Sequence, residues 1–373
     1  MDVLPSKSSE MMQASISIDE AKNKYVERVG SSRRSPHTVR AYGTAMRVFF
    51  AMLKWKGIDV NTTGIEALSE DEVANFISFL NQSKKNHTSG DGRKSGRKRG
   101  NQGLGKGKTY QTATAKLYLG VVSQFYKFLV AENIRTVNLP RIQMLIRMRG
   151  SKSYPQKPQP PREIVEIVET IMLLGSPPTE SLLEQLRTLR DRALIVTLAD
   201  TGLRIHEACK LKCADLDLNE GKAMIIGKGN QQAIVRFSSR SIKAIRDYLQ
   251  EREALDKESQ QAMHTLPVFS EHRGRKITSI TTATGRTIVA RRVKEAVDAI
   301  NETRDSDNKI LPYVVEKITP HTFRHHFVTT VLRQKGNLKI AQVMARHKSI
   351  TSTQIYAHVD DVELDKEYYD TFG

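Results

Sequence analysis

Apolar residues recur at helical spacing through most of the first 135 residues. Between Pro36 and Leu53 they fall three or four positions apart, which is the spacing of one buried face of an α-helix. The same spacing predicts three further helices, at about residues 16–29, 69–80 and 110–131. Helices with one apolar face pack against each other. We therefore predict an all-helical domain over residues 15–135, after a disordered lead at residues 1–14.

The pattern changes after residue 135. Residues 136–162 contain five prolines and several basic residues, which is typical of a linker between domains. Within residues 222–238, two short runs rich in β-branched residues flank a Gly-rich turn and predict a β-hairpin. Helical spacing returns on both sides of this hairpin, at about residues 162–175, 181–198, 239–256 and 287–302. Residues 163–373 are thus expected to form a mixed α/β domain, and the whole chain is mainly α with a small β-hairpin or sheet.

A further amphipathic pattern follows near the C-terminus. It begins at Phe327 and continues past a Gly336-Asn337 break, where Ile340, Val343 and Met344 are predicted to complete the apolar face.

The charge of the chain points to a polyanionic partner. The net charge is +18, and residues 1–150 carry 25 Lys and Arg against 12 Asp and Glu. Such an excess usually reflects binding to nucleic acid, and we expect double-stranded DNA. A basic protein that is merely soluble is the alternative.

The most basic segment lies inside the first domain. Residues 83–108 hold nine Lys and Arg, one Asp and seven Gly, with almost no apolar residue, so they cannot bury a core and are predicted to form a mobile loop. One interpretation is an arm that lies along the DNA backbone; the other is a solvated insertion. The candidate DNA-binding residues are those of this loop and of the break after the first helix: Lys94, Arg97, Lys98, Arg99, Arg33 and Arg34.

Several other classes of protein are disfavoured. Cys209 and Cys213 are four apart in a predicted helix, without the other ligands of a zinc site, and we interpret them as reduced, packed residues. No metal ligand set and no cofactor motif is evident. No run of about 18 apolar residues predicts a membrane span, and residues 1–13 lack the layout of a signal peptide. A cytoplasmic protein is expected.

Candidate chemistry concentrates in residues 319–358. His321 and Arg324 are three apart and share one side of a predicted helix, and His347 and Tyr356 follow. Arg holds phosphate with two hydrogen bonds, His moves protons, and Tyr can be a covalent nucleophile. Each of these residues alone would more often be a cap, a core residue or a packing residue. Their order and spacing, and a second cluster upstream, favour phosphate chemistry.

The upstream cluster supplies further candidate residues. It comprises the stretches TGLRIHEACKLKCADLDL, with Arg204 and Glu207, and IIGKGNQQAIVRF, with Lys228. Together with HTFRHHFVTTVLRQKGNLKIAQVMARHKSITSTQIYAHV, they resemble the tyrosine recombinase (phage-integrase-like) family. The resemblance covers residues 160–373 and, more loosely, the helical bundle, which corresponds to the core-binding domain of the family. It places the catalytic positions at Arg204, Lys228, His321, Arg324, His347 and Tyr356.

The resemblance implies a role for each position. Arg204 and Arg324 would hold the non-bridging oxygens of a phosphodiester and offset the charge of the transition state. His347 would hydrogen-bond the same phosphate. Glu207 would orient its cationic neighbours.

Nucleophile and proton transfers fall on the other three residues. Tyr356 would attack phosphorus and form a covalent 3′-phosphotyrosine. Its unperturbed pKa is about 10, so it needs a base or a cationic pocket, and His321 is the candidate for its proton. Lys228 would protonate the leaving 5′ oxygen. Because the bond energy is kept in the phosphotyrosine, neither ATP nor a metal is required.

The chain departs from the family pattern at two places, and two further tyrosines could in principle be the nucleophile. Ala345-Arg346 stands where the family usually has Leu-Gly before the second His, and Phe323 stands where Leu is commoner. Tyr368 and Tyr369 lie outside the matched motif, within an amphipathic segment at residues 359–373. In this family that segment docks on a neighbouring subunit.

The sequence therefore predicts a site-specific DNA recombinase or integrase whose two domains clamp the duplex. A homotetramer on two DNA sites would exchange strands through a Holliday junction, as the resemblance implies. The alternatives are a type IB topoisomerase, which religates the same strand, a non-catalytic DNA-binding regulator and a metal-dependent nuclease.

Overall fold

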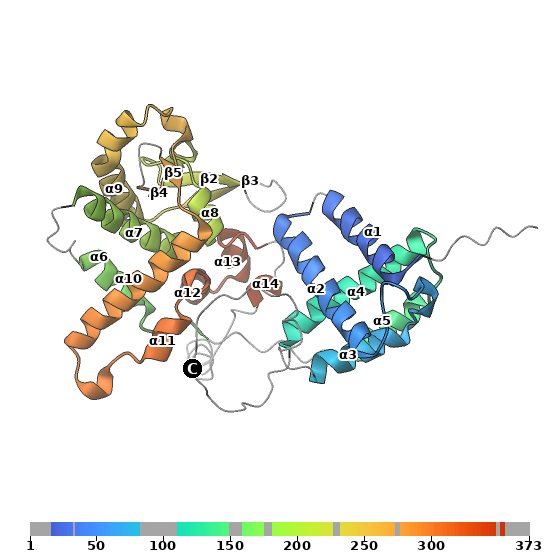
Figure 1. The fold of residues 1–373 in the computed structure, drawn as a ribbon. Coiled ribbons are helices and arrows are strands. Elements are labelled where there is room, and N and C mark those ends of the chain that lie inside the picture. Colours follow the sequence, from blue (N-terminus) through green and yellow to red (C-terminus); the bar gives the residue numbers. More distant parts are fainter. Residues whose placement is uncertain are drawn as a thin grey trace, which may run out of the picture. The chain divides into compact units, whose positions relative to one another are not determined.

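The chain divides into two compact units, residues 1–154 and residues 155–373 (Figure 1). The structure is a computed structural model, and it describes residues 16–32, 34–82, 110–148, 159–174, 181–226, 232–272, 277–347 and 351–354. None of the described helices is both long and apolar enough to cross a membrane.

The described part of the first unit is entirely helical. Its elements are α1 (Ile18–Ser31), α2 (Pro36–Trp55), a 3-10 turn η1 (Ile65–Ala67), α3 (Asp71–Gln82), α4 (Thr112–Ala131) and α5 (Leu139–Met148). Two serines begin the first two helices: Ser17 forms a capping box with Glu20, and the Ser35 hydroxyl accepts from the Thr38 N–H. The apolar faces meet in a core that includes the fully buried rings of Phe49, Phe76 and Tyr126.

Helix α5 lies within residues 136–162, the range that the sequence assigns to a linker. Its Ile142 is fully buried in the first core, and Arg141 forms ion pairs with Glu70 and Asp71 of the α3 region. Pro140 suggested a chain break. It occupies the first turn of the helix, where the missing N–H costs nothing. Residues 139–148 are therefore part of the first unit.

The second unit combines helices with two small antiparallel sheets. Its helices are α6 (Ile164–Leu173), α7 (Leu182–Thr201), α8 (Ile205–Lys210), α9 (Ser239–Glu258), α10 (Thr282–Glu302), α11 (Pro312–Lys317), α12 (Pro320–Lys335), α13 (Leu338–Met344) and α14 (Thr351–Gln354), with 3-10 turns η3 (Cys213–Asp215), η4 (Met263–Thr265) and η5 (Ser306–Asn308). Its strands are β1 (Leu216–Asp217), β2 (Lys222–Ile226), β3 (Gln232–Arg236), β4 (Ser270–Glu271) and β5 (Thr278–Ser279).

The predicted β-hairpin is present. Strands β1, β2 and β3 form one sheet in that order, and β2 pairs with β3 from Lys222 opposite Arg236 to Ile226 opposite Gln232. The two cysteines do not share a helix, because α8 ends at Lys210; Cys209 lies in α8 and Cys213 begins η3. Both are free thiols.

Helix α7 runs through the centre of the second unit. Asp191 on this helix is completely buried, and its carboxylate accepts from Arg190 and from Arg291 and Arg292 of α10. A buried carboxylate held by several guanidinium groups fixes the position of the helices that supply them. The C-terminal end of α7, where the candidate catalytic residues begin, is thereby fixed relative to α10.

The apolar pattern of α13 differs from the prediction. Ile340, Val343 and Met344 are 42%, 62% and 37% exposed, whereas Ala341 and Ala345 are fully buried against Val328 of α12. Alanines let α13 approach α12 closely, so the small residues face α12 and the larger ones are exposed.

Candidate active site

The site is built around a sharp turn at the end of α7. Gly202 adopts the left-handed conformation, with φ +60°, and directs the chain from α7 into α8. A Cβ at this position would lie 2.4 Å from Cδ1 of Phe327 on α12. Both the backbone conformation and the close approach of α12 therefore require glycine.

The carbonyl of Gly202 accepts hydrogen bonds from two guanidinium groups. Nη1 of Arg324 donates to it, and so does Nη2 of Arg346 at 3.2 Å. The Nη2 group of Arg324 donates to the carbonyl of Ala345. Arg324 is only 4% exposed, so these carbonyls hold it firmly in place. The turn after α7 and the end of α13 thus position the predicted phosphate-binding arginine of α12.

Arg204 and Glu207 meet at the beginning of α8. The Glu207 carboxylate accepts from the backbone N–H of Arg204 at 2.9 Å and from its Nη1 at 2.8 Å. The spacing of three residues makes this a capping arrangement, with Glu207 at the third helical position. Burial alone would raise the pKa of Glu207, but the Arg204 N–H and the charges of Arg346 and Arg204 hold it below the usual value. Glu207 is therefore an anion that orients Arg204.

His347 is attached to the short helix α14. Its Nδ1 lies 2.9 Å from Oγ1 of Thr353, which is fully buried. Gln342 holds the backbone of His347 on both sides: its carbonyl accepts from the His347 N–H at 3.0 Å, and its Nε2 donates to the His347 carbonyl at 3.2 Å. Thr353, three residues before Tyr356, is thus hydrogen-bonded to His347, and His347 directly follows Arg346 in the chain.

His321 lies on the same helix as Arg324 but in a different environment. Its side chain is exposed, whereas Arg324 is buried. His321 lines a pocket of about 470 Å³ together with Glu163, Tyr313 and Lys317. The sequence places His321 and Arg324 on one side of a helix, so it does not show that Arg324 is buried and His321 exposed.

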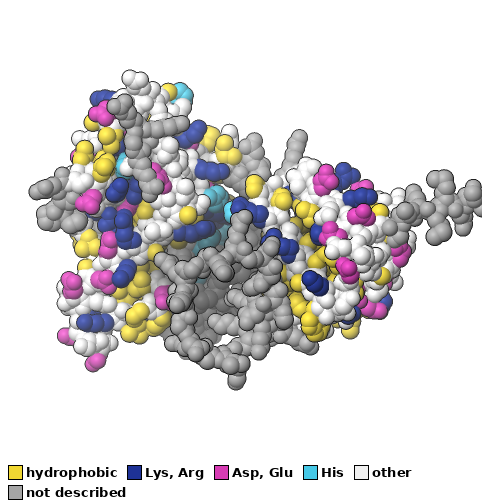
Figure 2. Space-filling view, viewed as in Figure 1, with side chains coloured by type: hydrophobic (Ala, Val, Ile, Leu, Met, Phe, Trp, Pro, Cys, Tyr) yellow, Lys and Arg dark blue, Asp and Glu magenta, His cyan; other side chains and the backbone are white. Residues whose placement is uncertain are grey.

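Arg346 was not among the predicted site residues. It has a φ of +56°, its side chain is 11% exposed, and its Nη2 lies 3.5 Å from Oε2 of Glu207. Burial lowers the pKa of Arg346, and Glu207 opposes this effect. The signal in the sequence was the departure Ala345-Arg346 directly before His347. Figure 2 shows basic and histidine side chains together at the surface near α8 and α13.

The remaining predicted site residues divide into two groups. Arg34 is described and lies in the first unit, with its guanidinium carbon 4.7 Å from the centroid of the Tyr42 ring. The others lie outside the described residues: Lys228, Tyr356, Arg33, Lys94, Arg97, Lys98 and Arg99. Among the described residues, no three His, Cys, Asp or Glu side chains gather as metal ligands would.

The architecture matches solved recombinases and integrases. The XerH site-specific recombinase bound to difH substrate has a TM-score of 0.57 at 19% identity, covering 90% of this chain and 79% of that chain. The Tn1549 transposon integrase in complex with transposon right end DNA has a TM-score of 0.58 at 16% identity, covering 95% and 99%. A lambda integrase dimer bound to a core site has a TM-score of 0.56 at 16% identity, covering 94% and 81%. The fold is that of the tyrosine recombinases, which confirms the predicted fold class.

Sequence comparison then defines the family. Tyrosine recombinase XerC of Thermodesulfovibrio yellowstonii is 27% identical over 334 residues, covering 90% of this chain and 89% of the relative. XerC of Chlorobaculum parvum is 28% identical over 345 residues, covering 90% and 88%. The model of the phage integrase family matches residues 176–363, so the chain belongs to the phage integrase family. The predicted family is confirmed, and its enzyme class is that of a site-specific tyrosine recombinase.

The close approach of Phe327 makes Gly202 a sensitive test of the site. We expect Gly202→Ala to lower the free energy of unfolding by about 2–4 kcal/mol, since it adds a steric clash to the strain of a left-handed alanine. Gly336→Ala is the matched control: Gly336 has φ +58°, but a Cβ added there would meet nothing within 4 Å, so a decrease of only about 1 kcal/mol is expected. Urea unfolding measures both, and equal decreases would show that the Phe327 contact is unimportant.

Proposed function

We propose that this chain breaks and rejoins DNA strands at specific sites through a covalent 3′-phosphotyrosine formed by Tyr356. The observation that carries the proposal is the convergence of Arg204 and Arg324 on one turn, beside a His347 that is tied to the helix preceding Tyr356. This arrangement suits a phosphodiester, which carries negative charge and resists attack until that charge is offset.

The charge of the cluster matches the reaction. Arg204, Arg324 and Arg346 contribute three positive charges and Glu207 one negative charge, which leaves an excess of two. A phosphodiester carries one negative charge, and attack by a tyrosine oxygen adds negative charge at phosphorus in the transition state. Fixed guanidinium groups stabilise such a state without reorganising, because their partners already hold them.

The proton transfers are assigned to the other predicted residues. The Tyr356 oxygen forms a bond to phosphorus as the bond from phosphorus to the 5′ oxygen breaks. His321 accepts the tyrosine proton, and Lys228 donates a proton to the departing 5′ oxygen. His347 hydrogen-bonds the phosphate. Attack by the 5′ hydroxyl of a partner strand reverses these steps and releases the tyrosine, so no energy-rich cofactor or metal enters the cycle.

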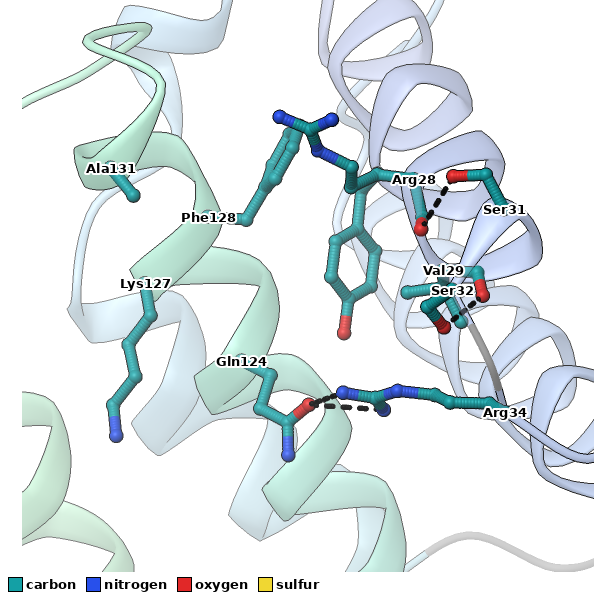
Figure 3. Close-up of a pocket in the computed structure, with 10 residues that line it drawn as sticks. Arg28, Val29, Ser31, Ser32, Arg34, Gln124, Lys127, Phe128 and Ala131 are labelled. Atoms are coloured by element: carbon teal, nitrogen blue, oxygen red, sulfur yellow. Dashed lines mark hydrogen bonds between the residues drawn. The ribbon is translucent and has the colours of Figure 1, made fainter.

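The first unit is proposed to bind the duplex. A pocket of about 550 Å³ near the beginning of α2 is lined by Arg28, Arg34 and Lys127, of which Arg28 also forms an ion pair with Glu132 (Figure 3). Arg34 reaches across it to Gln124 of α4, with both Nη groups 3.5 Å from Oε1. Such a pocket suits a backbone phosphate. The basic residues at positions 83–108 would add contacts of the same kind.

We further propose the domain roles and the assembly. Residues 15–135, with α5 added, would form the core-binding domain, and residues 163–373 the catalytic domain. Four copies on two DNA sites would exchange strands through a Holliday junction, with residues 359–373 of each copy docking on the next. The substrate is double-stranded DNA, and a cytoplasmic site of action is proposed with it.

Replacement of the nucleophile tests the chemistry. We expect Tyr356→Phe to bind a DNA site selected from random duplexes as tightly as the unchanged chain, but to form no covalent adduct, because the ring lacks the attacking oxygen. Adducts are measured by denaturing electrophoresis of labelled DNA. Tyr368→Phe and Tyr369→Phe are matched controls and should retain the adduct. An adduct that persisted in Tyr356→Phe would refute the assignment.

The alternatives differ in the step after DNA binding or cleavage. Exchange of strands between two labelled sites supports recombination. Relaxation of a supercoiled plasmid without any exchange would instead identify a type IB topoisomerase. Loss of activity in chelator would point to a metal-dependent nuclease, and binding without any cleavage to a regulator.

Neutralising the basic segment tests its role in binding. With Lys94, Arg97, Lys98 and Arg99 all changed to Gln, we expect weaker binding to every sequence. The slope of log K against log salt should become shallower by about 0.9 for each phosphate that the protein no longer neutralises. The control changes the same number of charges at exposed lysines of the second unit, Lys243, Lys257, Lys294 and Lys309. If the variant in residues 83–108 keeps the affinity and salt slope of the unchanged chain, the segment is a solvated insertion.

A further inference from the structure

Arg346 occupies an unfavourable backbone conformation. Its φ of +56° belongs to the left-handed region, which glycine adopts freely and most other residues adopt only with strain. Among the described residues, Asn133 and Gln260 are the other non-glycine residues with positive φ, and both are exposed. Arg346 differs from them because its side chain turns inward and is 11% exposed.

Burial adds a second cost at this position. A guanidinium group removed from water must be compensated by hydrogen bonds and opposite charge. Arg346 donates to the carbonyls of Met344 and Gly202 at 3.1 and 3.2 Å and lies 3.5 Å from Glu207. Its Nε is buried and has no hydrogen-bond partner among the described residues. Packing alone does not account for a residue that is both strained and incompletely compensated.

The partners of Arg346 are the groups that hold the two phosphate-binding arginines. Glu207 accepts from Arg204 through Oε1 and from Arg346 through Oε2. The Gly202 carbonyl accepts from Arg324 and from Arg346. One side chain therefore connects the acceptor of Arg204 with the acceptor of Arg324.

We propose that Arg346 is a positioning residue for DNA cleavage, which fixes Glu207 and the Gly202 carbonyl so that Arg204 and Arg324 face one phosphate together. This inference rests on the proposed function and extends it to a residue outside the predicted catalytic set. Besides its share of the positive charge of the cluster, Arg346 acts through its two partners, Glu207 and the Gly202 carbonyl. Its role requires the geometry of a guanidinium, which can donate to two acceptors at once.

Arg346→Gly is the informative variant, because glycine removes the side chain and relieves the backbone strain. We expect a melting temperature that is unchanged or higher by a few degrees and a DNA affinity within about two-fold of the unchanged chain. The single-turnover rate of covalent adduct formation should fall by about ten-fold or more, since misplacement of a clamp slows chemistry without abolishing it. A rate equal to that of the unchanged chain would overturn the inference.

Two rescue measurements separate positioning from simple charge or space filling. Guanidinium ion at millimolar concentration should restore part of the rate to Arg346→Gly, whereas sodium at the same ionic strength should not. Arg346→Lys keeps the charge but not the fork of donors, so it should remain slow. Full activity in Arg346→Lys, or no difference between guanidinium and sodium, would count against positioning.

A double-mutant cycle tests the route through Glu207. If Arg346 acts by holding Glu207, the double variant Arg346→Gly, Glu207→Gln should be slowed by a smaller factor than the product of the two single-variant factors. Decreases that multiply fully would overturn that route. The failure of the underlying proposal is distinguishable: an unchanged chain that forms no adduct on its selected DNA would refute the proposed function, and this inference with it.

Discussion

The proposed active site depends on the carbonyl of Gly202. Gly202 takes a left-handed conformation, and its carbonyl accepts from the guanidinium groups of Arg324 in α12 and of Arg346 in the turn after α13. A side chain at this position would collide with Phe327, so glycine permits both the turn and the approach of α12. The helix that carries it is fixed to α10 through the buried carboxylate of Asp191. The core of the second unit thereby determines where the arginines can lie.

The electrostatics of the cluster follow from this geometry. Three guanidinium groups held near one turn repel each other, and the repulsion grows as water is excluded. Glu207 offsets one of the charges, and neutral carbonyl oxygens accept from the arginines without cancelling the rest. Net positive charge therefore remains in a partly buried place, and a phosphate anion is the group that would reduce it. The uncompensated positive charge destabilises the free site, and in the proposed reaction it would stabilise the negatively charged transition state.

Much of the architecture could be predicted from the sequence, because helical periodicity and capping act over a few residues. The resemblance implies that Glu207 orients its cationic neighbours, and in the structure its carboxylate accepts from Arg204. The burial of Arg324 and the exposure of His321 could not be predicted, since both depend on how α12 packs against the end of α7. Pro140 suggested a break, although its place in the first turn of α5 allows the helix to continue. For Arg346, the sequence showed an unusual residue, but only its φ and its partners reveal an inward-facing guanidinium.

The hydrogen bond between His347 and Thr353 relates this cluster to the predicted nucleophile, Tyr356. Helix α14 spans only Thr351–Gln354, and a helix of four residues has no stability of its own, since nucleation costs more than so few hydrogen bonds return. Its position must come from tertiary contacts, among them the hydrogen bond between the buried Thr353 hydroxyl and Nδ1 of His347. A single hydrogen bond contributes about 1 kcal/mol to such an attachment, and the burial of Thr353 adds to it. Arg324 and Arg346, by contrast, each donate to at least two acceptors, and Arg204 is held by the Glu207 carboxylate. The proposed phosphate-binding arginines thus have fixed partners, and α14 is joined to them through the histidine that would bind the same phosphate.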